Sequence, residues 1–355
     1  MQKLNQQTQK QKGVALILYV LVLVLSGMST LLYFLNESNL KNKRLNKTYT
    51  SLAEAKAALI GYSVLNASKP GTLPCPDTDN NGNSNSSVAN CSSYIGRLPW
   101  RLQLGMTMLK DSHGECLWYA LSPVFRTQMT NPTRLLNPLN STTNGTINVV
   151  NDSDAPIASA NPVLAVIFAP NYPVTGQNRS GAATIYCPGD SVASKYLDTK
   201  GLVNNAIGNV IGANYTFKIG AVDNGFNDQL VYITARDLYP ALRKRITKEI
   251  VGNPSPLAVP SGLVKYYQTF ANTYPCPAKS VTGNADCTLP LGNNVPYNDA
   301  IEPLQYTALS SWLNDNGWFA MTTYTYISSQ HVKVTVTDPL GNYTCDANLN
   351  VITCS

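Results

Sequence analysis

The chain has 355 residues, of which 44% are hydrophobic and 13% are charged, and its formal net charge is +6. This share of apolar side chains excludes a wholly disordered protein, and the length suits one or two globular domains. The chain contains only two histidines, which excludes most hydrolase triads and histidine-ligated metal sites. The charge is too small to indicate nucleic-acid binding by itself.

The first 35 residues predict a membrane helix. Residues 1–13 are polar, with three lysines and no acidic residue, and Val14–Leu35 form a run of 22 residues without a charge. At about 1.5 Å per residue, a helix of this length spans a hydrocarbon core of about 30 Å. All eight cysteines follow the run, so we expect the rest of the chain in an oxidising periplasmic or extracellular compartment.

The junction between the polar and apolar segments resembles a known processing site. Lys12-Gly13 directly precedes Val14-Ala15-Leu16-Ile17, which is similar to the class III leader of type IV pilins and type II secretion pseudopilins. The resemblance implies that a prepilin peptidase cuts between Gly13 and Val14 and that the new N-terminus is methylated. An uncleaved signal-anchor is the alternative interpretation.

One position departs from the pattern of that family. Most pilins have a glutamate at the fifth residue after the cut, where this chain has Leu18. In major pilins the carboxylate is thought to meet the amino terminus of a neighbouring subunit, because a charge in lipid needs a partner. Leu18 offers no such pair to a subunit above it, and in this respect the chain resembles the minor subunits that lie at a filament tip.

The helix is expected to continue beyond the membrane. Apolar residues recur at three- and four-residue steps, as a stripe of Leu45, Tyr49, Leu52, Ala55, Leu59, Tyr62 and Leu65. We predict one helix over 14–66, about 80 Å long at the usual rise, whose outer half packs on the head through Leu52 and Leu59. A break at Ser51, which forms a capping-box pattern with Glu54, is the alternative.

The rest of the chain alternates strand-like runs with polar loops. Strands are predicted at 163–169, 183–187, 215–222 and 229–234, and a terminal hairpin is predicted at 319–327 and 331–337. A second helix is predicted to begin with Asp237 as its N-cap. The expected fold class is α+β. In this fold a long N-terminal pilin-type helix, half in the membrane and half in the head, packs on an antiparallel-sheet head with disulfides.

The predicted domain organisation has five parts. They are a leader at 1–13, a transmembrane and stalk helix at 14–66, a first head lobe at 67–251, a linker at 252–262 and a smaller disulfide-stapled lobe at 263–355. After the linker, LVKYYQTFANTYPCPA with Leu289-Pro290 echoes LIGYSVLNASKPGTLPCPD with Leu98-Pro99. These segments are interpreted either as an internal duplication or as a coincidence of short Pro/Cys patterns.

The cysteines are interpreted as disulfides. Short loops favour Cys75–Cys91, Cys276–Cys287 and Cys345–Cys354, which leaves Cys116–Cys187 as the long pair. Each short loop would restrict the unfolded chain by roughly 3 kcal/mol. Zinc is the rival interpretation, but the chain has no Cys-x-x-Cys. The last pair also resembles the C-terminal disulfide loop of secreted pilins.

The sharpest candidate site is the segment 77–82. Its oxygen donors Asp77, Asp79 and Asn81 at alternate positions, followed by Gly82, match the opening of a calcium loop, because calcium takes several hard oxygen ligands. The twelfth position is Val88 in place of a bidentate glutamate, so a further ligand would have to come from elsewhere. A polar turn inside the Cys75–Cys91 bridge is the alternative. The similar segment 223–228 is interpreted as a turn.

Two other clusters carry weaker chemical interpretations. Ser112, His113 and Glu115 are near neighbours, but adjacent residues rarely assemble a catalytic triad, so we interpret them as structural. The basic cluster is interpreted as a solvated helix face rather than a DNA-binding surface, and consists of Arg243, Lys244, Arg245 and Lys248.

Together these patterns predict a non-enzymatic minor pilin or pseudopilin that caps or initiates a type IV pilus or a type II secretion pseudopilus through helix–helix assembly. The expected partners are other pilin subunits, the prepilin peptidase and, before assembly, the inner membrane, with the head in the periplasm. Calcium is the one cofactor that the sequence indicates. An adhesin or DNA-binding minor pilin, with a surface or DNA ligand at the pilus tip, is one alternative. A membrane-anchored periplasmic enzyme is the other.

Overall fold

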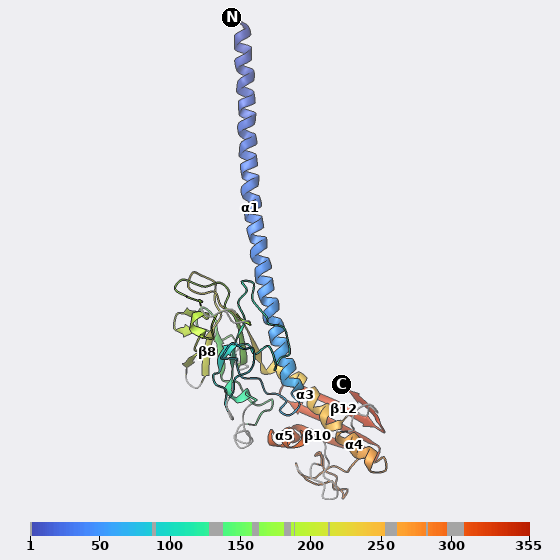
Figure 1. Cartoon of the computed structure of the whole chain (residues 1–355). Coiled ribbons are helices and arrows are strands. Elements are labelled where there is room, and N and C mark those ends of the chain that lie inside the picture. The colour runs from blue at the N-terminus through green and yellow to red at the C-terminus, as the bar shows by residue number, and fades with distance from the viewer. Residues whose placement is uncertain are drawn as a thin grey trace. The chain divides into compact units, whose positions relative to one another are not determined.

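The computed structural model describes residues 2–86, 90–127, 138–157, 163–180, 186–187, 189–211, 214–252, 261–281, 283–296 and 309–355 (Figure 1). The side chains at 2–16, 29–38, 209–211 and 310 lie outside this description. The chain divides into two units, Met1–Thr50 and Ser51–Ser355. The larger unit has an α+β fold with mainly antiparallel strands and disulfide bonds.

The helices differ greatly in length. They are α1 (Gln2–Leu65), α3 (Ala235–Val251), α4 (Gly262–Thr269) and α5 (Ser310–Asp315), with 3-10 helices η1 (Pro123–Phe125), η2 (Ala193–Lys195) and η3 (Phe319–Met321). Helix α1 has no break at Ser51, because the Ser51 hydroxyl donates to the Lys110 carbonyl at 2.7 Å instead of capping a helix. After Leu65, Asn66 Oδ1 accepts the N–H groups of Ser68 and Lys69, which satisfies two donors of the following turn.

A seven-stranded sheet forms one part of the larger unit. Its path is β1-β2-β4-β3-β8-β7, with β9 also paired to β4, and its only parallel pair among the described strands is β3 with β8. The strands are β1 (Ile95–Arg97), β2 (Trp118–Leu121), β3 (Ile147–Val150), β4 (Val163–Ala169), β7 (Asn209–Ile211), β8 (Asn214–Lys218) and β9 (Gln229–Thr234). A small hairpin of β5 (Thr199–Lys200) and β6 (Val203–Asn204) is separate. The prediction at 183–187 lies mostly outside the described residues.

Strand β4 is buried along its whole length, which explains its unbroken apolar sequence. Ile167 and Ala169 belong to one buried cluster, and Val166 and Phe168 belong to a second cluster. A strand covered on both faces needs apolar residues at consecutive positions rather than at alternate ones.

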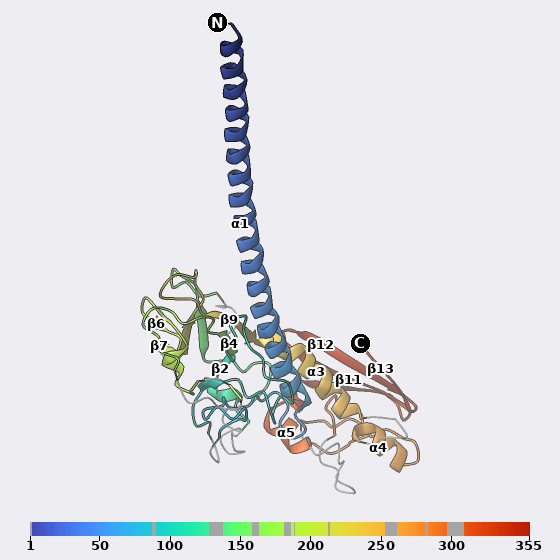
Figure 2. The ribbon, with the colours of Figure 1, turned by 45° about the horizontal axis from the view of Figure 1, so that its top comes forward.

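The second sheet is an antiparallel meander of four strands, β10-β11-β12-β13. Its strands are β10 (Thr322–Ser328), β11 (His331–Asp338), β12 (Gly341–Asn348) and β13 (Val351–Cys354). Val332, Val334 and Val336 are fully buried, and helix α3 packs against β11 and β12 (Figure 2). The terminal hairpin predicted at 319–327 and 331–337 is confirmed as β10 and β11, except that residues 319–321 form η3 and the strand begins at Thr322.

Helix α3 begins earlier than predicted. Thr234, not Asp237, is the N-cap, and Asp237 occupies the third position of the helix. Asp237 Oδ2 accepts the N–H of Thr234 at 2.8 Å, and the two residues form a capping box. The prediction of Asp237 as N-cap is therefore wrong, because its carboxylate reaches back to cap from inside the first turn.

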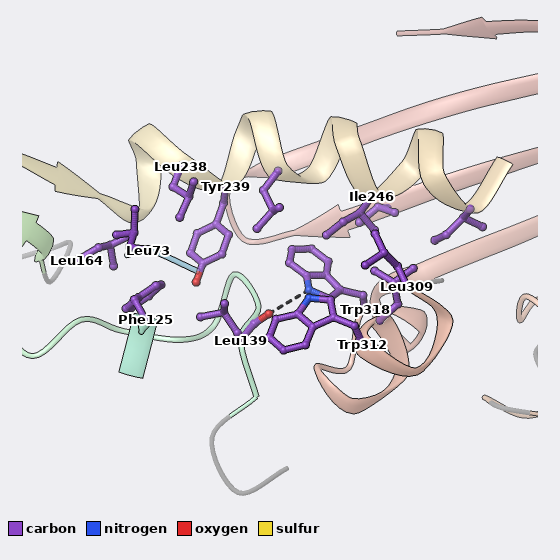
Figure 3. Close-up of a cluster of buried hydrophobic side chains, with 14 of the residues drawn as sticks. Leu73, Phe125, Leu139, Leu164, Leu238, Tyr239, Ile246, Leu309, Trp312 and Trp318 are labelled. Atoms are coloured by element: carbon purple, nitrogen blue, oxygen red, sulfur yellow. Dashed lines mark hydrogen bonds between the residues drawn. The ribbon is translucent and has the colours of Figure 1, made fainter. Parts of the chain in front are cut away.

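One core cluster joins residues from both predicted head lobes. Figure 3 shows Tyr239 of α3 among side chains from both sides of the 252–262 segment, which are Leu73, Phe125, Leu139, Trp312 and Trp318. The Trp318 indole donates a hydrogen bond to the Leu139 carbonyl at 3.0 Å. The predicted lobes 67–251 and 263–355 therefore share buried apolar contacts.

All four predicted disulfides are present. Cys75–Cys91, Cys276–Cys287 and Cys345–Cys354 close loops with sequence separations of 16, 11 and 9 residues, and Cys116–Cys187 closes the long one of 71. No free cysteine occurs among the described residues.

The two Pro-Cys-Pro segments share a local backbone arrangement. Asp77 and Arg97 exchange backbone hydrogen bonds at 2.9 and 2.7 Å, and Ala278 and Asn294 exchange the same pair at 2.9 and 3.2 Å. In both pairs the second residue, Arg97 or Asn294, is followed by an apolar residue and a proline. Val295-Pro296 therefore corresponds to Leu98-Pro99. The sequence comparison had matched Leu289-Pro290 with Leu98-Pro99, but the structure matches Val295-Pro296 with Leu98-Pro99 instead. Duplication itself stays a prediction.

Candidate functional site

Exposed apolar side chains form a continuous run along the part of α1 between Ile17 and Leu25. Every residue from Ile17 to Leu25, together with Met28, is large, apolar and between 51% and 66% exposed. Leu18 belongs to this set at 58%. Because consecutive residues point in different directions around a helix, the apolar surface encircles this part of α1.

The predicted membrane span and processing site extend beyond these side chains. In the part of the chain that the structure describes, no helix is apolar over a length sufficient to cross a bilayer. The predicted span Val14–Leu35 includes 14–16 and 29–35, whose side chains lie outside the described residues. The side chain of Val14 at the predicted cut is outside them as well.

The C-terminal part of α1 belongs to the core of the larger unit. Leu52, Ala55 and Leu59 are fully buried, whereas Leu65 at the end of the same stripe is 73% exposed. Leu52 and Leu59 therefore pack on the head as the amphipathic stripe predicted. Their side chains are not available for contact with a neighbouring subunit.

The loop at 77–82 is organised around a buried carboxylate. Asp77 is 1% exposed, and its Oδ1 accepts the N–H groups of Asp79 and Asn80 at 3.1 and 2.8 Å. Its Oδ2 accepts the N–H of Gly82 at 2.6 Å. A side chain at Gly82 would collide with the Trp100 indole, since an added Cβ would lie 2.7 Å from the ring. The chain therefore needs glycine at this tight turn.

The other two predicted calcium ligands also have partners inside the loop. Asp79 Oδ2 accepts Nδ2 of Asn81 at 2.9 Å and Nδ2 of Asn85 at 3.0 Å. Asn81 Oδ1 accepts the N–H of Asn83 at 2.7 Å. Within the described ranges, no three His, Cys, Asp or Glu side chains come together in a way that could hold a metal ion. Val88, at the twelfth loop position, lies outside those ranges.

Burial affects the proton affinity of this loop. Desolvation raises the pKa of Asp77 to about 6, although the bonds from backbone N–H groups act in the opposite direction. The oxygens of Asp77, Asp79 and Asn81 accept hydrogen bonds from groups of the same loop, as in a polar turn. Calcium binding stays a prediction.

The Ser112–His113–Glu115 segment has the geometry of a structured turn. Ser112 Oγ lies 3.1 Å from His113 Nδ1, with Ser112 half-buried and His113 exposed. Asp111 is fully buried, and its Oδ1 accepts the N–H groups of His113 and Glu115. The Glu115 carboxylate lies 3.5 Å from Arg179 and so is directed to a different partner from His113. The non-enzymatic prediction remains untested.

The basic cluster of α3 separates into residues with different surroundings. Arg243 is buried and forms an ion pair with Asp338, whose side chain is fully buried. Arg245 pairs with Glu249 at 3.0 Å, and Lys244 lies over the ring of Tyr343. The four basic residues therefore do not form one continuous exposed face.

A buried acidic pair was not predicted from the sequence. Asp198 Oδ2 accepts the N–H of Asn227 at 2.6 Å, and Asp228 Oδ2 accepts the N–H of Asp198 at 2.7 Å. Burial and the adjacent Asp198 carboxylate raise the pKa of Asp228 well above its usual value, so this group retains a proton at pH values where an exposed aspartate is ionised. The only sequence signal for this pair was the run of oxygen-bearing side chains at 223–228, which contains Asp228. Asp198 lies thirty residues earlier, in another loop.

No protein-family model, curated protein or solved structure matches this chain.

Proposed function

We propose that this protein is a minor pilin or pseudopilin that caps or initiates a type IV pilus or type II secretion pseudopilus. The observation that carries the proposal is the ring of exposed apolar side chains over Ile17–Leu25 of α1. Such a surface is unfavourable in water and stable against lipid or against other apolar helices. The Lys12-Gly13-Val14 junction, which resembles a prepilin leader, precedes it directly.

Two environments would cover this surface in succession. Before assembly, the inner membrane would surround the apolar part of α1, with the head in the periplasm. After cleavage by a prepilin peptidase, the helices of other pilin subunits would replace the lipid. The Cys75–Cys91, Cys116–Cys187, Cys276–Cys287 and Cys345–Cys354 disulfides support an oxidising location for the head.

Leu18 supports a position at the end of the filament. An aliphatic side chain at the fifth position after the cut cannot neutralise the amino terminus of a subunit added next to it. It does add apolar area to the helix, so the subunit would still be retained among other helices. This combination favours initiation or capping over repeated incorporation.

Processing of the leader tests the proposal. The full chain would be expressed in bacteria with and without a prepilin peptidase, and the N-terminus would be read by mass spectrometry of the purified protein. We expect a peptidase-dependent start at Val14 with a methylated amine. Gly13→Val should abolish the cut, whereas Gly27→Val, at a helical glycine with open space around it, should leave it intact. A chain that retains residues 1–13 beside an active peptidase would contradict the proposal.

Deletion distinguishes assembly from the surface-binding alternative. If the protein initiates filaments, its removal abolishes them. Intact filaments with lost adhesion or DNA uptake would instead assign it to the adhesin or DNA-binding class.

A further inference from the structure

Strand β13 leaves one edge of the four-stranded sheet open. In the described chain β13 pairs with β12 alone. Thr344 and Ser355 exchange both of their backbone hydrogen bonds at 2.9 Å, so they are a hydrogen-bonded pair of the antiparallel ladder. Because such pairs alternate along the ladder, the N–H and C=O groups of Ile352 and Cys354 point away from β12. These groups are free to pair with a further strand.

A groove of about 570 Å³ lies beside this edge. On the sheet it is lined by Tyr343, Ile352 and Cys354, and on α3 by Arg245, Lys248 and Glu249. The sheet therefore supplies an apolar wall and the helix supplies a charged wall. An extended chain added to β13 would direct every second side chain into this groove, because side chains alternate between the two faces of a strand.

The charge of the groove is positive. Arg245 is partly neutralised by Glu249 at 3.0 Å. Lys248 is exposed and makes no ion pair with any described residue. Lys244, on the same helix, lies with its Nζ 5.6 Å from the centre of the ring of Tyr343, which lines the groove. Among the side chains that an incoming strand could place in the groove, a carboxylate would therefore bind most favourably.

We propose that the β13 edge binds an extended acidic peptide segment of a partner protein by strand addition. Backbone hydrogen bonds to Ile352 and Cys354 would give affinity, and carboxylates facing Lys248 and Arg245 would give specificity. The proposal does not depend on the pilin assignment, because it rests on the edge, the groove and its charge.

Peptide binding by the full chain in detergent micelles tests this inference. The probe is a fluorescein-labelled hexapeptide of alternating glutamate and valine, followed by fluorescence anisotropy. Two comparison peptides replace glutamate by lysine or carry N-methyl groups at alternate backbone nitrogens, which removes strand donors. We expect both comparison peptides to bind at least about tenfold more weakly.

Variants of the protein identify the surface. Lys248→Glu should weaken binding of the glutamate peptide by about tenfold or more, and Lys248→Gln should weaken it by less. Lys333→Glu is the matched control, because Lys333 lies on the other face of the same sheet, 3.2 Å from Asp346, and should leave binding unchanged. Equal unfolding midpoints would show that the variants are folded.

Several results would overturn the inference. They are no binding of the glutamate peptide, equal binding of its N-methylated form, or equal binding by Lys248→Glu. Self-association that blocks the edge would assign it to a second copy of the chain. Displacement of the peptide by duplex DNA in a Lys248-dependent manner would assign the groove to nucleic acid.

Discussion

Replacing Asp77 by alanine removes the acceptor around which the 77–82 loop is folded. Three backbone N–H groups, at 3.1, 2.8 and 2.6 Å from its oxygens, would lose their partner in a site where Asp77 is only 1% exposed. At about 1–1.5 kcal/mol for each bond, the free energy of unfolding should fall by about 3–5 kcal/mol. Asp79→Ala is the control and should cost less than about 1 kcal/mol, because Asp79 is exposed.

The same residue should make stability depend on pH. Burial raises the pKa of Asp77 to about 6 from 3.8, so the folded state binds its proton more tightly than the unfolded state. This contribution is complete below about pH 4 and is lost as the pH rises through about 6, a change of roughly 3 kcal/mol. Asp77→Asn should remove that pH dependence while retaining an acceptor for the N–H groups of Asp79 and Asn80.

Urea unfolding followed by tryptophan fluorescence measures both effects and also tests calcium. If the loop binds calcium, a concentration of about 100 times Kd should stabilise the protein by about 2.7 kcal/mol, and Asp79→Ala should abolish the gain. An unchanged midpoint would leave the loop as a structural turn. Asp77 does not organise the loop in this way if Asp77→Ala costs no more than Asp79→Ala, or if the native chain and Asp77→Asn show the same change in stability between about pH 4 and 6.

Three further predictions concern the head. Leu59→Ala should lower the free energy of unfolding by about 2–5 kcal/mol, because Leu59 is fully buried. Leu65→Ala, at a 73% exposed position, should change it by less than about 0.5 kcal/mol. Equal costs in urea unfolding would show that the stripe does not pack as described. Arg243→Met should lower the free energy of unfolding by about 3–5 kcal/mol, because it leaves the buried Asp338 carboxylate unpaired. Adding Asp338→Asn should recover part of this loss, which thermal unfolding of the single and double variants would measure. Asp228→Asn should reduce the fall in stability with rising pH, because the pKa of Asp228 is raised in the folded state and its ionisation there is unfavourable. An equal change in the free energy of unfolding between pH 5 and pH 8 for both proteins would contradict this.

The sequence predicted the elements whose pattern is local. The runs at 163–169 and 229–234 coincide with β4 and β9, and the short disulfide loops follow from cysteine spacing. The predicted strand at 215–222 is shorter in the structure, because β8 ends at Lys218 and the chain then passes close to Asp152 at Gly220, where an added Cβ would lie 2.4 Å from the Asp152 carboxylate. Such a contact across the fold is absent from local periodicity.

The candidate sites show the same division. The calcium pattern at 77–82 indicated a polar loop rich in oxygen acceptors, but not that the Asp77 carboxylate would accept backbone N–H groups of the loop itself. The Asp198–Asp228 pair depends on two loops that exchange side-chain-to-backbone hydrogen bonds, and neither loop has a periodic sequence. Likewise, the charge of the β13 groove is apparent only once α3 and the C-terminal strands are placed side by side.

The long disulfide sets a limit on how far the head can be stretched. A load applied between Ser51 and Ser355 cannot extend the residues enclosed by Cys116–Cys187, which have a sequence separation of 71. At about 3.4 Å per residue, this single bond withholds about 240 Å of contour length. A subunit under tension would therefore unravel only in the segments outside its disulfide loops, and its full extension would be shorter than that of the reduced chain by this length. Single-molecule pulling before and after reduction would show this difference in extension directly.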